Sequence, residues 1–303
     1  MKVKKLCEDI LPEPLYMLIR NVHTNIYKCY VKYCYRNLHD INGKLCEANK
    51  VHLEYWNGAP NIGDQLAPVI FRYVMKAKEL NPNVKVQKIR HLLTIGSLLD
   101  GNHADAVVWG SGILGIEGIR RLADRKKYMK YDIRAVRGPI SREILESMGY
   151  ICPQIYGDPG ILMPLIYDPK IKSDKKYRVS VIYSYSTPEK EKTKEYHTID
   201  IRTSDYEKVI DEIIASEQII SESLHGIILA ETYGIPAILL RKKGVDAFPL
   251  KYYDWYYSTK RYTVKTAATI EEAMGAEPMP LPELSGMRQQ LLDCFPMDIF
   301  IKE

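Results

Sequence analysis

The residues best suited to chemistry surround one histidine, His225, in the segment IISESLHGIILAETYG. Ile219 and Ile220 predict the end of a strand, and residues 227–233 predict a helix that stops at Gly234. The first turn of a helix exposes unpaired N–H groups that attract phosphate or carboxylate, and an imidazole beside it can give or take a proton near neutral pH. The segment therefore predicts an anion site with its own acid or base, although a histidine here can also be only a capping or packing residue.

Polar, glycine-rich and basic residues follow several other apolar segments. They are Asn61, Gly63 and Asp64 after VHLEYW, Gly110, Ser111 and Gly112 after AVVW, Arg134 and Arg137 in DIRAVRG, and Asp158 after QIY. Because parallel strands end at one edge of a sheet, we expect these groups to lie together. Each has a simpler explanation, since Gly-Ser-Gly is common in turns, Asp158 can close a turn and Arg137 can pair with a core carboxylate.

Strand-like and helix-like segments alternate from Val51 onward, which predicts an α/β fold with parallel sheets covered by helices. The polar stretch at 167–178 has the composition of a linker, so we expect two Rossmann-like domains whose strand ends face a cleft. The expected units are an N-terminal helical extension at 1–48, domains at 49–170 and 171–280, and a C-terminal helical segment at 281–303.

Residues 11–38 predict a basic amphipathic helix. Its apolar and aromatic positions at helical spacing are Leu15, Leu18, Ile19, Val22, Ile26, Tyr30 and Tyr33, and its cations are Arg20, Lys28, Lys32 and Arg36. No acidic residue lies between Pro14 and Leu38. Such a helix can lie on an anionic membrane surface, and the alternative is a helix packed on the main body.

Composition narrows the class of protein. The chain has 303 residues, 46% of them hydrophobic, and a net charge of +5. This charge suits an anionic small molecule or membrane face and, without a binding motif, does not indicate nucleic acid. We find no secretory signal and no apolar run of the ~18 residues that a membrane span needs, so we expect a cytoplasmic protein. The six cysteines form no C-x-x-C pair, so no metal is expected, with a site using His23 and His39 as the alternative.

The ordered motifs NIGDQLAP, WGSGIL, RAVRGPISREILESMGY, YGDPGILMP, SESLHGIILAETYGIPAILL and KYYDWYYSTKR, over about residues 50–262, resemble the polysaccharide pyruvyl transferase family. The resemblance implies a two-domain fold similar to GT-B glycosyltransferases. It implies transfer of pyruvate from phosphoenolpyruvate onto two hydroxyls of a sugar as a cyclic ketal, without a cofactor, in bacterial surface polysaccharide biosynthesis. It also implies a polyprenyl-diphosphate-linked oligosaccharide as acceptor, at the inner face of the cytoplasmic membrane.

Leu224 and His225 match the family's R-L-H-type donor motif, and Ser223 stands where arginine often stands. The anion contact that this arginine would make is then either absent or supplied by another cation. His225 is the expected general acid or activator of the phosphate. The expected donor-binding residues are Arg134, Arg137, Ser111, Gly112, Ser221, Ser223, Leu224, Gly226 and Arg241, with Lys242 as a further cation, and the expected acceptor or cleft residues are Asn61, Gly63, Asp64, Gly110, Asp158 and Lys251. The alternatives are a GT-B glycosyltransferase that uses a nucleotide sugar and a non-catalytic binding protein of a glycan pathway.

Overall fold

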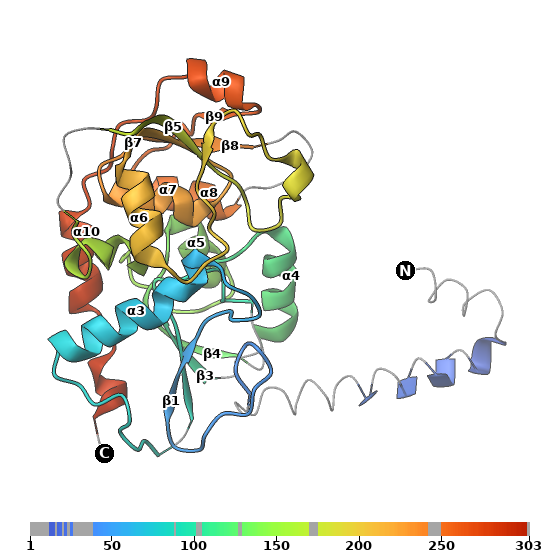
Figure 1. Cartoon of the computed structure of the whole chain (residues 1–303). Helices are drawn as coiled ribbons and strands as arrows, with labels where there is room; N and C mark the ends of the chain where they lie inside the picture. The colour runs from blue at the N-terminus through green and yellow to red at the C-terminus, as the bar shows by residue number, and fades with distance from the viewer. Residues whose placement is uncertain are drawn as a thin grey trace.

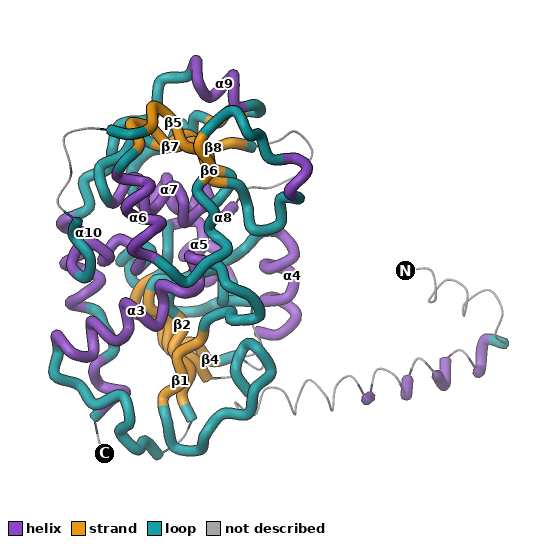
Figure 2. Tube along the Cα trace, in the orientation of Figure 1, coloured by secondary structure: helices purple, strands orange, loops and turns teal. Residues whose placement is uncertain are grey.

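Two parallel β-sheets with helices packed on them form the body of the protein (Figures 1 and 2). In the computed structural model the first sheet has the strand order β1-β2-β3-β4, and the second has the order β6-β5-β7-β8-β9. The structure describes residues 12–301 except for 16, 20, 23–24, 27–38, 88, 101–104, 127–128, 170–174 and 242–249. This is the α/β, Rossmann-like arrangement that the alternating pattern predicts, and it is GT-B-like, as the family resemblance implies.

The first sheet consists of β1 (Val51–Glu54), β2 (Arg90–Leu93), β3 (Asp105–Trp109) and β4 (Lys130–Ala135). Its central strands are buried along most of their length, as expected for a parallel sheet that is covered on both sides. Helix α3 (Ile62–Ala77) packs on one face through Leu66 and Ile70, in the same core cluster as Val107. Helices α4 (Ile116–Arg125) and α5 (Pro139–Ser147) pack on the opposite face.

The second sheet consists of β5 (Tyr177–Ile182), β6 (His197–Thr198), β7 (Ser216–Ser221), β8 (Ala237–Leu240) and β9 (Thr266–Ala267). Helices α6 (Tyr206–Ile214) and α7 (Leu224–Thr232) pack on one face, and α9 (Ile270–Gly275) packs on the other. The chain moves from β5 to β6 on one side and then continues with β7 on the other side. Such a reversal of strand order opens a crevice at the carboxyl ends of the two strands, here β5 and β7.

One core cluster runs through both halves, because α7 lies between the sheets and is buried along almost its whole length. The short 3-10 helix η2 (Pro159–Leu165) packs against both α3 and α7. The remaining helices are η3 (Glu189–Glu191), α8 (Leu250–Ser258), α10 (Ser285–Asp293) and η4 (Met297–Phe300). Helix α10 returns to the first half, where Trp109 Nε1 donates a hydrogen bond of 2.8 Å to the carbonyl of Leu291.

Helix α8 connects the two halves through a buried carboxylate. Asp254 is fully buried, and its oxygens accept hydrogen bonds from the backbone N (3.0 Å) and the hydroxyl (2.6 Å) of Ser141 in α5. One of these oxygens also lies 3.4 Å from Nε of Arg137. The next residue, Trp255, donates from Nε1 to Glu231 of α7 at 2.8 Å. Helix α8 therefore joins the start of α5 to α7.

The alternation of strands and helices is confirmed, with local differences. Helix α7 begins at Leu224, three residues before the expected start, so His225 lies inside the first turn. Helices α4 and α8 were not predicted from the sequence. The expected domain boundary after residue 170 falls at 170–174, outside the described residues, and stays a prediction. Within the described part of the chain, no helix has the length and apolar content needed to cross a membrane.

Candidate functional site

The first turns of α3 and α7, one from each half of the protein, meet at the ring of His225. A Cβ atom added to Gly63 would lie 2.7 Å from Cε1 of His225 and closer still to Nδ1, so the imidazole rests directly on the backbone of α3. Ser223 caps α7, since its hydroxyl accepts a hydrogen bond of 3.4 Å from the backbone N of Gly226. Because the His225 ring lies against the backbone of α3, position 63 has to be glycine if the ring is to keep this place.

A buried carboxylate lies on the other side of the same imidazole. Nε2 of His225 is 3.5 Å from Oδ2 of Asp158, whose side chain is fully buried. Oδ1 of Asp158 caps η2 by accepting a hydrogen bond of 2.9 Å from Gly160 N. Among the described residues, neither Nε2 nor Oδ2 has a hydrogen-bond partner, so their approach is an ion-pair contact. Asp158 can therefore orient the imidazole, while 14% of the His225 side chain stays exposed.

Asp64 adds a second titratable group beside the histidine. Burial raises the pKa of Asp64, and the charges of His225 and Lys251 and a hydrogen bond of 2.6 Å from Asn61 Nδ2 oppose that shift. A carboxyl group with a raised pKa next to an imidazole is a suitable proton carrier. The predicted cleft residues Asn61, Gly63, Asp64 and Asp158 thus lie together around His225.

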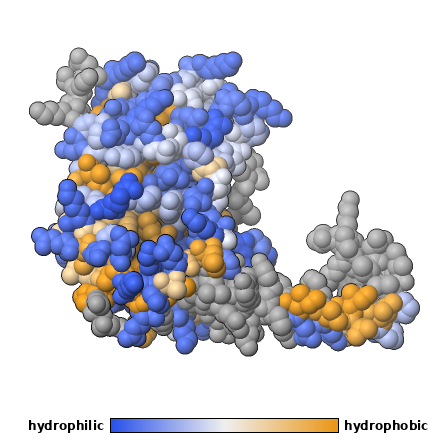
Figure 3. Space-filling model, turned by 60° about the horizontal axis from the view of Figure 1, so that its bottom comes forward, coloured by the Kyte–Doolittle hydropathy of each residue, from blue (hydrophilic) through white to orange (hydrophobic). Residues whose placement is uncertain are grey.

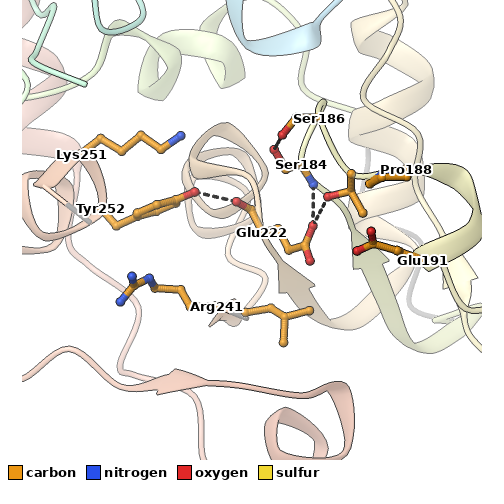
Figure 4. A pocket seen from close by; sticks show the side chains of 10 residues that line it. Ser184, Ser186, Pro188, Glu191, Glu222, Arg241, Lys251 and Tyr252 are labelled. Atoms are coloured by element: carbon orange, nitrogen blue, oxygen red, sulfur yellow. Dashed lines mark hydrogen bonds between the residues drawn. The ribbon is translucent and has the colours of Figure 1, made fainter. Parts of the chain in front are cut away.

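A cavity of about 420 Å³ opens beside this group, at the carboxyl ends of β5, β7 and β8 (Figure 4). Its lining residues are Ser184, Ser186, Thr187, Pro188, Glu191, Glu222, Leu240, Arg241, Lys251 and Tyr252. Glu222, which precedes His225 by three residues, belongs to the lining, and Lys251 contributes charge both here and at Asp64. The cavity and the histidine are therefore neighbouring parts of one site at the crevice where the strand order reverses between β5 and β7.

The cavity combines cations with a fixed carboxylate. Oε2 of Glu222 accepts hydrogen bonds from the backbone N of Ser184 (3.0 Å) and from the hydroxyl of Thr187 (2.5 Å). The hydroxyl of Tyr252 donates to the backbone carbonyl of Glu222 at 2.7 Å, and Nζ of Lys251 lies 4.9 Å from the Tyr252 ring centroid. Arg241 supplies the second cation of the lining. Such a set of groups can hold an anion and sugar hydroxyls together.

Arg137 lies in the protein interior and not in the cavity lining. Its side chain is fully buried, and its terminal nitrogens donate to Ser97 Oγ (3.0 Å) and to the carbonyl of Ile113 (2.8 Å). Its Nε faces Asp254, and a Cβ added to Gly112 would come within 2.5 Å of its Cζ. This geometry favours the core ion pair over the predicted donor-binding role, because every side of the guanidinium contacts protein.

Arg134 is also remote from the cavity lining. Its guanidinium binds Asp132 on β4 and Asp298 of η4, with N–O distances of 2.7–3.0 Å. Ser111 is buried, and its hydroxyl donates to Gly96 O (2.9 Å) and accepts from Leu98 N (3.1 Å). These contacts give both residues structural roles, whereas the sequence analysis expected both of them to bind the donor.

Other predicted residues shape the turns around the site. Gly110 has a φ angle of 89°, and a side chain there would overlap Pro159, so the exit of β3 and the start of η2 approach each other closely. Ser221 donates to the carbonyl of Ser223 at 2.9 Å and closes the turn before α7. Leu224 is buried in the core. Lys242 lies outside the described residues.

Three parts of the cavity lining were not predicted from the sequence. Glu222 was passed over between Ser221 and Ser223, although a carboxylate directly after an apolar strand is a signal for the strand-end site. Ser184 and Thr187 follow β5 in the same way. Tyr252 carried no local signal, because it enters the cavity from α8.

Comparisons with known proteins add a family to this geometry. A family model described as polysaccharide pyruvyl transferase matches residues 5–244. The match begins well before NIGDQLAP, the first of the motifs that carry the resemblance. An uncharacterized protein of Acanthamoeba polyphaga mimivirus is 26% identical over 221 residues, covering 68% of this chain and 73% of that protein. The crystal structure of a functionally uncharacterized protein from Klebsiella pneumoniae superposes with a TM-score of 0.47 and 12% identity, over 80% of this chain and 98% of the other.

The contact between α3 and the imidazole can be tested by Gly63→Ala. We expect the added methyl to displace the ring, to shift the NMR signals of His225 and to lower the free energy of unfolding by about 1–3 kcal/mol. Gly286→Ala in α10 is the matched control, because nothing lies within 4 Å of its added Cβ, and stability there should stay the same or rise slightly. Unchanged His225 signals in a folded Gly63→Ala protein would contradict the contact.

Proposed function

The chain belongs to the polysaccharide pyruvyl transferase family, and from this premise we propose that it transfers the pyruvyl group of phosphoenolpyruvate onto two sugar hydroxyls as a cyclic ketal. The observation that carries the proposal is the position of His225. Its imidazole is held between Gly63 and Asp158 at the start of a helix, beside a cavity that presents two cations. This is an acid next to an anion site, which the reaction requires.

The donor carries a carboxylate and a phosphate, so its binding site needs cations and N–H groups. Arg241 and Lys251 line the cavity, and α7 begins beside it. We assign the anion contacts to these three features. Ser223 acts as the helix cap in this chain, so the contact that an arginine makes elsewhere in the family falls to Arg241 and Lys251.

The reaction needs one proton delivered to carbon and two removed from oxygen. Protonation of the methylene carbon makes an oxocarbenium-like centre at C2, and the first sugar hydroxyl adds there and loses its proton. The bond from C2 to the phosphate oxygen then breaks, phosphate leaves with a proton, and the second hydroxyl closes the ketal as it loses its own. His225 is the proposed donor of the proton to the methylene carbon or to the phosphate, Asp158 orients it, and Asp64 is the nearest second carrier.

Glu222 is the proposed contact for the acceptor sugar. Its carboxylate lines the cavity and is fixed by Ser184 and Thr187 at one oxygen. A fixed carboxylate accepts hydrogen bonds from sugar hydroxyls and strengthens them as nucleophiles. The proposed acceptor is a polyprenyl-diphosphate-linked oligosaccharide of a bacterial surface polysaccharide pathway.

The role of His225 can be tested by His225→Gln. We expect the rate of ketal formation from phosphoenolpyruvate to fall by roughly 10²–10⁴-fold, because proton transfer is lost while the fold is kept. Mass spectrometry of the glycan, which gains one pyruvyl ketal, measures the rate. A folded variant within tenfold of the parent removes His225 from the chemistry, and transfer from a nucleotide sugar by the parent would identify a glycosyltransferase.

The anion contacts can be separated from the core ion pair by three alanine substitutions. Arg241→Ala and Lys251→Ala should each raise the KM for phosphoenolpyruvate by roughly 10-fold or more with little change in the free energy of unfolding, since each removes a charge-assisted contact. Arg137→Ala should instead lower the free energy of unfolding by about 3–5 kcal/mol, because Asp254 stays buried without its cation. A raised KM in a stable Arg137→Ala protein would return Arg137 to the donor site.

We also propose that the N-terminal segment binds an anionic membrane, where a polyprenyl-linked acceptor resides. The described residues between 13 and 26 are helical and lie apart from the body, with an apolar strip along them (Figure 3). Leu18 is 60% exposed and Ile26 is 64% exposed. The four cations of the segment lie outside the described residues, and each contributes about 1 kcal/mol near an anionic surface. These features support the membrane over packing on the body.

Vesicle flotation tests the membrane proposal. The full chain should float with anionic vesicles at low salt, should ignore neutral vesicles, and should be released at about 1 M salt, where the Debye length is about 3 Å. Leu18→Ser combined with Ile26→Ser should abolish flotation, whereas Leu281→Ser, at an exposed leucine outside the segment, should not. A full chain that ignores anionic vesicles at low salt contradicts the proposal.

A further inference from the structure

Three potential metal ligands of different kinds meet inside the first half of the protein, outside the His225 site. Cys46, Glu54 and His91 are all buried, with side-chain exposures of 0% for Glu54 and His91. One ligand atom from each residue lies within 4.8 Å of the ligand atoms of the other two. The proposed function makes no use of this cluster.

The strand register explains why two of these residues meet. His52 of β1 is paired with His91 of β2, so Glu54 and His91 lie on one face of the sheet, and Leu53 and Leu92 lie on the face covered by α3. Nδ1 of His91 lies 2.7 Å from Oε1 of Glu54. The edge of the sheet thus presents an imidazole and a carboxylate together.

The third residue comes from a loop that covers this face. His39 and Leu45 form an antiparallel bridge, and the backbone N of Ile41 donates a hydrogen bond of 2.7 Å to Oε2 of Glu54. The loop then brings Cys46 down onto the sheet, where its thiol is buried. The pKa of this thiol is raised to about 12, first by burial and then by the charges of Glu54 and Asp40. Metal binding would therefore have to displace the thiol proton.

We propose that Cys46, Glu54 and His91 bind Zn²⁺ and that the ion ties the loop at 39–46 to the edge of the first sheet. Sulfur, imidazole nitrogen and carboxylate oxygen are the donors that zinc uses in proteins. At zinc–ligand distances of about 2.0–2.3 Å, tetrahedral ligand atoms stand roughly 3.3–3.6 Å apart. Small side-chain rotations bring the three atoms to this spacing, with the contact between Glu54 and His91 lengthening. A water molecule completes the tetrahedron.

Zinc bound by these three residues stabilises the fold of the protein. The loop at 39–46 is the connection between the N-terminal segment and the first sheet. An ion held by one loop residue and two strand residues closes that connection and stabilises the folded state over the unfolded one. This cluster could not be predicted from the sequence, because its members are separated by 8 and 37 positions and match no zinc-type spacing.

The test measures zinc in the full chain purified without chelators. We expect about one zinc ion per chain, a lower Tm after removal with a chelator, and restoration of Tm by added zinc. Replacing zinc with cobalt should produce a thiolate-to-cobalt charge-transfer band, which reports a sulfur ligand directly. Cys46→Ser should lose the band and the response of Tm to chelator, whereas Cys152→Ser, at a buried thiol elsewhere, should keep both.

A chain that keeps only Cys46 of its six cysteines tests whether another thiol binds the cobalt. This chain should retain the cobalt band. This chain and the unmodified protein decide the question even if Cys46→Ser does not fold. A cooperatively folding full chain that binds no zinc on titration overturns the proposal. So does a cobalt band that persists in Cys46→Ser.

Discussion

The site depends on one buried carboxylate, that of Asp254. This carboxylate accepts hydrogen bonds from the backbone N and the hydroxyl of Ser141 and faces the guanidinium of Arg137. Arg137 in turn donates hydrogen bonds to Ser97 and Ile113, which follow β2 and β3. A charge with no access to water is tolerated only when such partners surround it. Helix α8 lies so close to the start of α5 that a side chain on Gly138 would overlap the backbone carbonyl of Asp254. The position of α8 on the first half is therefore narrowly defined.

The same helix sets the position of α7. Glu231 of α7 accepts from Trp255 Nε1 at 2.8 Å and from both terminal nitrogens of Arg261, at 2.5 Å and 2.8 Å. Since α8 is fixed to α5 by Asp254, these bonds place α7 relative to the first half. His225, in the first turn of α7, then arrives at Gly63. Two polar clusters in the interior thus align the His225 imidazole of one half with the α3 backbone of the other.

Much of the fold and part of the site could be predicted from the sequence, because those features are local. Alternating apolar segments indicate parallel strands, and a histidine after an apolar strand marks the strand end. The interior role of Arg137 could not be predicted, since its partner Asp254 is 117 positions away in a segment that was not predicted to be helical. Glu222 followed the predicted strand, yet its importance appears only when Thr187 and Tyr252 close around it. Which polar residues face the cavity is decided by their long-range partners and not by their residue types.

The buried connection through α8 has a consequence for how substrates reach the site. A two-domain enzyme that opens like a hinge needs a wet, weakly joined boundary between its domains. Here separation would strip Asp254 of Arg137 and Ser141 and would split the apolar core that α7 shares with both sheets. The structure therefore favours a rigid frame around the cavity, which the proposed substrates would enter and leave through its open mouth.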